Sequence, residues 1–163
     1  MKKLIAPKPI VPKLIALGLL ALLPALSFAA DGYAVIFKAQ GKYADVRDFI
    51  HAGIESEGLK INSMGHIADM LERTGKDVGA ARQVYEYGEQ FEFCSATLSR
   101  AMMEADPHAI ALCPFIISVY QLPGDKTVYV SYRKPVQTKN AKLRKVLADI
   151  EKLEVKIIKD AIE

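Results

Sequence analysis

An almost uninterrupted apolar run from Ala111 to Leu122 constrains the fold of this chain more than any other segment. Such a run is expected of a strand at the centre of a sheet, where both faces are covered. The residues Pro123-Gly124-Asp125 then favour a turn. The segment from Thr127 to Tyr132 is expected to pair back as the second arm of a hairpin. The core of the domain should therefore be built on a sheet.

Helical patterns alternate with the strand patterns along the chain. Residues Tyr43 to Glu57 carry apolar side chains at helical spacing, and Gly58 follows as a helix stop. A last helix, from about Ala141 to Ile162, presents one apolar stripe. Shorter helices are expected after Ser63 and Ser95, each of which can act as an N-cap.

Three further short strands are expected, at Gly32 to Lys38, Leu59 to Asn62 and Val84 to Phe93. The last of these alternates, so one face should carry its aromatic residues as a half-buried strand does. The sequence predicts an α+β domain with an antiparallel or mixed sheet of about 4–5 strands. Helices should cover mainly one face, and a long helix should end the chain. The aromatic face comprises Tyr85, Tyr87, Phe91 and Phe93.

Residues 1–30 have the pattern of a secretory signal peptide. Four lysines are followed by an apolar run from Leu14 to Leu26 and by small residues that suit a signal peptidase, with cleavage expected after Ala29 or Ala30. The apolar run is shorter than the roughly 20 residues of a membrane-spanning helix. We therefore expect residues 31–163 to form a single exported, periplasmic domain, in contact with the membrane only before cleavage. The alternative is a protein tethered to the membrane by an uncleaved N-terminal segment.

The charge of the domain argues against a nucleic-acid partner. The full chain has 22 basic and 19 acidic residues and a net charge of +3. Without the four lysines of the N-terminal segment the balance becomes about −1, and a nucleic-acid-binding domain needs a basic face. No nucleic-acid binding is expected.

Several short segments, in their order along the chain, resemble the domain of unknown function 302 family. The resemblance spans roughly Ala34 to Ile158 and implies a small α+β domain that tends to dimerise. It implies no reaction, because fold alone does not define function. The segments are Gly53-Ile54-Glu55-Ser56-Glu57-Gly58-Leu59, Phe93-Cys94-Ser95, Ala105-Asp106-Pro107 and Leu112-Cys113-Pro114-Phe115-Ile116-Ile117.

The two cysteines, Cys94 and Cys113, have different expected environments. Cys94 precedes a helix N-terminus, whose partial positive charge would lower its pKa and make it a candidate catalytic or ligand-binding thiolate. Cys113 opens an apolar strand, where burial favours an inert thiol. If the strand simply runs back along the helix, the two residues lie too far apart for a bridge. A Cys94–Cys113 disulfide is therefore considered but not favoured.

The sequence indicates one candidate ligand pocket, between the aromatic strand, the start of the helix after Cys94 and the basic segment from Arg133 to Lys145. Cations beside free N–H groups at a helix start can bind an anion. The competing interpretations are an aromatic core face and a solvated basic face. No metal site is expected and no cofactor is indicated. The candidate ligand-binding residues are Cys94, Tyr85, Tyr87, Arg133, Lys134 and Lys142.

These observations favour a periplasmic small-ligand-binding or accessory domain without catalytic activity over an enzyme. One alternative is a thiol or redox enzyme that uses Cys94. Another is a structural interaction module that forms a homodimer through the last helix. Its apolar stripe is widened by Val155, Ile158 and Ile162, which leaves apolar surface for a partner.

Overall fold

The computed structural model describes residues 28–30, 32–80 and 82–163. The predicted signal peptide therefore lies outside the described residues, except that residues 28–30 form a short edge strand. The expected cleavage after Ala29 or Ala30 falls within or at the end of that strand. In the described part of the chain, no helix combines the length and the apolarity needed to cross a bilayer.

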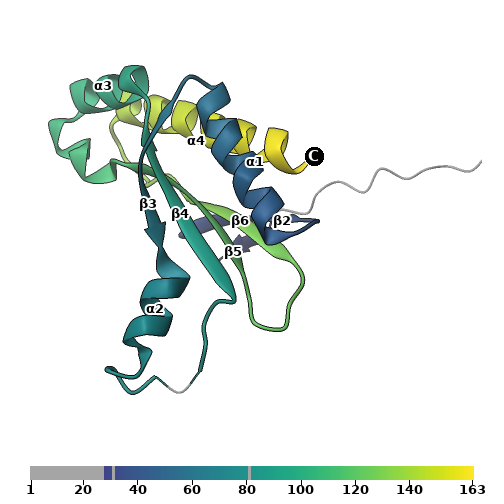
Figure 1. The fold of residues 1–163 in the computed structure, drawn as a ribbon. Helices are drawn as coiled ribbons and strands as arrows, with labels where there is room; N and C mark the ends of the chain where they lie inside the picture. The colour runs from purple at the N-terminus through teal and green to yellow at the C-terminus, as the bar shows by residue number, and fades with distance from the viewer. Residues whose placement is uncertain (1–27, 31, 81) are drawn as a thin grey trace, which may run out of the picture.

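The core of the protein is one antiparallel sheet in the strand order β1-β2-β6-β5-β4-β3 (Figure 1). This arrangement confirms the predicted α+β class. Of the two predicted alternatives, an antiparallel or a mixed sheet, the described strands form the antiparallel one. The described sheet has one strand more than expected, because β1 belongs to the segment assigned to the signal peptide. The strands are β1 (Phe28–Ala30), β2 (Ala34–Ala39), β3 (Lys60–His66), β4 (Tyr87–Cys94), β5 (Phe115–Gln121) and β6 (Val128–Arg133).

The helices α1, α3 and α4 cover one face of this sheet, while α2 extends beyond the end of β3 (Figure 1). Helix α1 crosses α4 closely at Gly53, where an added Cβ would lie 3.3 Å from the Ile157 side chain. Glycine at this position therefore lets the two helices approach. The helices are α1 (Tyr43–Ser56), α2 (Ile67–Gly75), α3 (Ala96–Ala105) and α4 (Ala141–Ile162), with a 3-10 helix η1 (Pro107–Leu112).

The apolar core lies between the sheet and the helices. Alternate residues of the central hairpin, such as Ile117 and Val130, point into it, as do Ile50 and Ile54 of α1. All four side chains are fully buried, and each such burial contributes about 1.5–3 kcal/mol. The predicted hairpin is confirmed, with β5 pairing with β6.

Much of the apolar stripe of α4 is covered within the protein itself, although Val155 and Ile162 are only partly buried. Ile158, which was expected to leave surface for a dimer contact, is fully buried in the core. That expectation is wrong for Ile158. The sheet covers one side of the apolar stripe of α4, and α1 packs on α4 and covers another side. The homodimer itself remains a prediction.

Several element boundaries differ from those expected, and at two of them the type of secondary structure changes. Strand β3 continues to His66 because Ser63 to His66 pair with β4, so α2 begins at Ile67 and Ser63 does not cap it. The segment from Pro107 to Leu112, whose last two residues were expected to begin the strand, is the 3-10 helix η1. The Asp106 carboxylate starts this helix by accepting a hydrogen bond from the His108 N–H at 3.0 Å.

Candidate functional site

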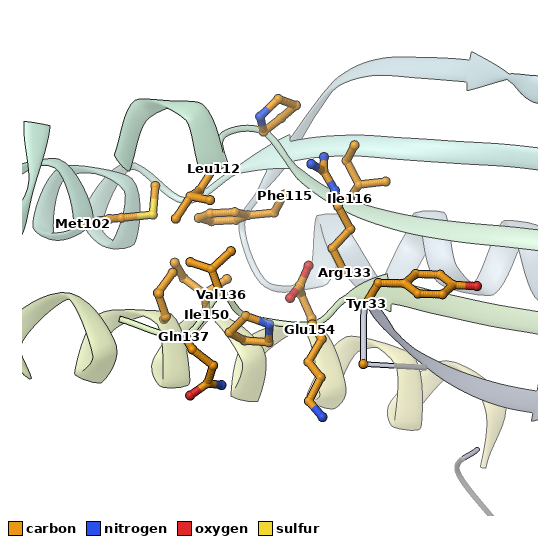
Figure 2. Close-up of a pocket in the computed structure, with 15 residues that line it drawn as sticks. Tyr33, Met102, Leu112, Phe115, Ile116, Arg133, Val136, Gln137, Ile150 and Glu154 are labelled. Atoms are coloured by element: carbon orange, nitrogen blue, oxygen red, sulfur yellow. The ribbon is translucent and has the colours of Figure 1, made fainter. Parts of the chain in front are cut away.

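A cavity of about 510 Å³ opens where the end of β6 and the start of β5 meet α4. Side chains from α3 and η1 close one side, and the loop after β6 closes another. This volume falls within the range of small-molecule sites. Figure 2 shows the side chains that project into the cavity from these elements.

The inner end of the cavity is apolar. Met102 of α3 and Ile150 of α4 are both buried and are parts of the hydrophobic core. Leu112 at the end of η1 and Phe115 at the start of β5 lie beside Met102, across the cavity from Ile150 (Figure 2). Val136, half exposed in the loop after β6, lies at the rim. An apolar group of a ligand would find hydrocarbon contacts on each of these walls.

The other end of the cavity is polar and contains Glu154 and Arg133 (Figure 2). Glu154 is the one charged residue among those described that is buried in the protein, with 4% of its surface exposed. Among the described residues, the Glu154 carboxyl group makes no side-chain hydrogen bond and no ion pair within 4 Å. A buried carboxyl that faces a cavity without a partner is costly to keep ionised, and such groups concentrate at binding sites.

The environment of Glu154 keeps its carboxyl group largely protonated at neutral pH. Burial is the main reason that its pKa rises to about 8, and the nearby Glu151 carboxylate adds to the rise. Arg133 opposes this rise only in part. Glu151 is itself held in place because it accepts a hydrogen bond from the Tyr132 hydroxyl at 2.9 Å. The polar end therefore combines a guanidinium cation with an uncharged acid that can donate a hydrogen bond.

The structure separates the six candidate ligand-binding residues. Arg133 and Lys134 line the cavity, whereas Cys94, Lys142 and the two tyrosines are absent from its lining. Tyr85 contacts the Tyr120 ring on the sheet face opposite the helices, with 5.6 Å between ring centroids. Tyr87 stacks on Tyr43 of α1 at 4.8 Å. The expectation that Tyr85 shares the face of Tyr87 is wrong, because β4 begins at Tyr87 and the alternation does not extend to Tyr85.

Two of the backbone N–H groups at the start of α4 are already bonded and are not free for an anion. The Asn140 side chain caps this helix and accepts hydrogen bonds from the N–H groups of Lys142 and Leu143, both at 3.1 Å. Its amide also donates to the Ala105 carbonyl at 2.9 Å, which joins the end of α3 to the start of α4. The predicted anion site assumed that the N–H groups at this helix start were unbonded. That assumption is wrong, because the Asn140 side-chain oxygen already accepts hydrogen bonds from two of them.

The two cysteines lie close together, contrary to the expected separation. The expectation assumed an extended return after α3, but the chain returns as η1, which packs against α3. The Cys113 thiol donates to the Ser99 hydroxyl in the first turns of α3 at 3.6 Å. Cys94 also interacts with Cys113, and both thiols are half-buried and free.

The pKa of Cys94 is raised, not lowered as the helix start was expected to do. Burial is the largest cause, followed by the nearby Cys113 thiol. Cys94 belongs to the end of β4, and Ser95 takes the N-cap position, where its hydroxyl accepts the Leu98 N–H at 3.3 Å. The predicted capping by Ser95 is confirmed, and the thiol gains little from the helix dipole.

A second polar cluster fastens α1 to the β3–β4 pair. The Tyr43 hydroxyl donates to one Glu89 oxygen at 3.2 Å, and the other oxygen lies 3.0 Å from His66 Nδ1. Burial and then Glu89 raise the pKa of Tyr43, so the phenol stays protonated. The contacts are those of a structural link between elements. In the described ranges, no three His, Cys, Asp or Glu side chains form a group suited to a metal ion.

Sequence reasoning did not single out Glu154, although a signal was present. Glu154 follows Leu147 by seven residues and Ile150 by four, so it occupies the apolar stripe of the last helix. A carboxyl group at such a position must be either buried or placed at a cavity.

Comparisons with known proteins give a consistent assignment of this fold. The family described as "Domain of unknown function DUF302" matches residues 35–161. A crystal structure of an uncharacterized conserved DUF302 protein from Bacillus stearothermophilus is similar, with a TM-score of 0.67 and 15% sequence identity. The match covers 81% of this chain and 99% of that one, and at this identity it shows the fold alone. No curated protein sequence matches. The chain belongs to the family called Domain of unknown function DUF302.

Proposed function

We propose that this protein binds a small amphipathic molecule, with an apolar body and an anionic head, in the cavity between β5, β6 and α4, and that it catalyses no reaction. The observation that carries the proposal is the division of one cavity into an apolar end and an end with Arg133 and the buried Glu154. Sites for small molecules typically combine apolar walls with a few polar groups that orient the ligand.

The polar end favours an anionic head over a cationic one. Arg133 and Lys134 both line the cavity and supply positive charge. Because the pKa of Glu154 is about 8, this carboxyl group is mostly uncharged at neutral pH and does not repel an anion. It can donate its proton in a hydrogen bond to a carboxylate or sulfonate oxygen, while Arg133 pairs with the charge.

The raised pKa of Cys94 supports a binding role over the alternative of a thiol enzyme. A nucleophilic cysteine needs a thiolate at working pH, and burial acts against it here. The alternative of a homodimeric interaction module remains a prediction, which sedimentation velocity of the purified domain would test.

The binding proposal is tested with two fluorescent probes that share an aromatic body. Anilinonaphthalene sulfonate carries an anionic head, and N-phenyl-1-naphthylamine lacks it. The native protein should bind the sulfonate at a single saturable site, and the neutral probe more weakly. Val136→Trp should remove binding of both, because the larger side chain fills the rim of the cavity while its position is half exposed. Val78→Trp, at an exposed position outside this cavity, is the matched control.

The head-group assignment is tested by charge removal. Arg133→Gln should weaken binding of the sulfonate by about tenfold, equal to about 1.4 kcal/mol, and should leave the neutral probe within about twofold. Lys142→Gln removes the same charge outside the cavity lining and should change neither affinity. Absence of saturable binding to the native protein, or equal effects of the two charge variants, would contradict the proposal.

We also propose that the protein is exported to the periplasm. The support is the pattern of residues 1–30, in which lysines, an apolar run and small residues follow each other. Intact mass of protein recovered from the periplasm of an expressing bacterium tests this. A mass that begins after Ala29 or Ala30 is expected, and an uncut chain in the membrane fraction would indicate a tether instead.

A further inference from the structure

The path of the chain between the two cysteines brings them to the same corner of the fold. Helix α3 carries the chain about 15 Å away from Cys94, at 1.5 Å per residue over its ten residues. The six residues of η1 then carry it about 12 Å, at 2.0 Å per residue. Because η1 packs against α3, Cys113 arrives near the first turns of α3.

Strand pairing gives a second, independent view of this proximity. Phe93 of β4 pairs directly with Phe115 of β5 in antiparallel register. Continuing the register by one residue places Cys94 opposite Pro114, and Cys113 is the neighbour of Pro114. Opposite Cα atoms in such a pair are about 4.5–5.5 Å apart, so Cys113, one residue from Pro114, is a diagonal neighbour of Cys94. The Cys94 side chain contacts the Cys113 side chain, as a disulfide with Cα atoms about 4.4–6.8 Å apart requires. The contact of the Cys113 thiol with Ser99 places its sulfur beside the start of α3.

We propose that Cys94 and Cys113 form a redox pair that closes to an intramolecular disulfide within the native fold. The oxidant is an external disulfide, either a small thiol in its oxidised form or a protein of an oxidising compartment. One cysteine thiolate attacks this disulfide and releases one thiol. The second cysteine then attacks the mixed disulfide and releases the other thiol. Two cysteine thiols are thereby oxidised, one disulfide is reduced to two thiols, and the two thiol protons leave with the products.

The partial exposure of both cysteines and the raised pKa of Cys94 favour slow, reversible formation of a disulfide. The two cysteines are partly exposed, so a small disulfide can reach them. Burial raises the pKa of Cys94, so closure should accelerate as pH rises above neutral. Leu112 and Pro114, on either side of Cys113, line the cavity described above. The bond would therefore tie this wall of the cavity to the end of β4.

The test titrates the folded full chain with mixtures of oxidised and reduced glutathione, followed by rapid alkylation and intact mass measurement. The expected product has lost two hydrogens and carries no glutathione. The equilibrium constant for closing the disulfide should be about tenfold or more larger in the folded chain than in the same chain in concentrated urea. The reason is that the fold holds the two thiols together. Cys94→Ser and Cys113→Ser should each yield a single glutathione adduct.

A second measurement does not depend on the variants. Phenylarsine oxide binds two neighbouring thiols at once, so one equivalent should protect both cysteines of the folded wild-type chain from alkylation. Two glutathione adducts without closure, an equilibrium constant no larger in the folded chain than in urea, or arsenical protection of neither thiol would each overturn the proposal.

Discussion

Replacing Glu154 with glutamine should stabilise this protein, and increasingly so as pH rises. Glutamine has nearly the shape of a protonated glutamic acid but cannot ionise. The wild-type carboxyl group has a pKa of about 8 in the folded protein, chiefly because it is buried. In the unfolded chain its pKa returns to the ordinary value of about 4.5. The variant therefore removes one specific titration from the stability of the fold.

The sign and size of the effect follow from proton linkage. Between about pH 4.5 and 8 the folded state still holds the proton that the unfolded state has lost. The free energy of unfolding of the wild type therefore falls as pH rises. Each pKa unit corresponds to about 1.4 kcal/mol, so Glu154 costs about 1 kcal/mol at pH 5, about 3 kcal/mol at pH 7 and about 4.5 kcal/mol at pH 9.

Urea unfolding followed by far-UV circular dichroism measures this cost at pH 5, 7 and 9. The difference between Glu154→Gln and wild type isolates the group, because every other titrating residue is common to both. Glu104→Gln, at an exposed position on α3 paired with Arg100, is the matched control and should follow the wild type within about 0.5 kcal/mol. A constant difference across pH, or a variant less stable than wild type at pH 9, would refute the buried and unpartnered state of this carboxyl group.

The proton on Glu154 should also affect ligand binding, and two helix contacts can be tested by their effect on stability. Binding of anilinonaphthalene sulfonate should weaken about tenfold between pH 7 and 9 as the proton leaves Glu154, and fluorescence titration of Glu154→Gln should show no such loss. Asn140→Ala should lower the free energy of unfolding by about 1–2 kcal/mol because it removes the cap of α4, and urea unfolding that matches the wild type would speak against this cap. Gly53→Val should cost about 1–3 kcal/mol through crowding of Ile157, and an unchanged thermal midpoint would show that α1 and α4 are farther apart than described.

Local patterns were enough to predict the main elements of the fold. The apolar run before Pro123 and the strand after it predicted the β5–β6 hairpin, and the long apolar stripe predicted α4. These signals are local because burial on a strand or a helix leaves a fixed period in the sequence. The partner that covers each stripe is set by tertiary packing, which is why the burial of Ile158 beneath a second helix could not be read from its period.

The candidate site was predicted only in part, for similar reasons. Arg133 and Lys134 were among the candidates and line the cavity, but the premise of an uncapped helix start was wrong. The approach of Cys113 to Cys94 depends on η1, a short 3-10 turn without a clear sequence period. Glu154 did carry a signal, as a carboxyl group on an apolar stripe, and such positions merit attention in sequences of this kind.

The most direct test of the account is to locate a bound anionic amphiphile on the protein by NMR spectroscopy. The chain is labelled at its methyl groups and titrated with anilinonaphthalene sulfonate. We expect saturable shifts, with contacts from probe protons, at Leu112, Leu147 and Ile150, which line the cavity. Shifts confined to the opposite sheet face around Ile36, or none that saturate, would contradict the assignment of the binding site.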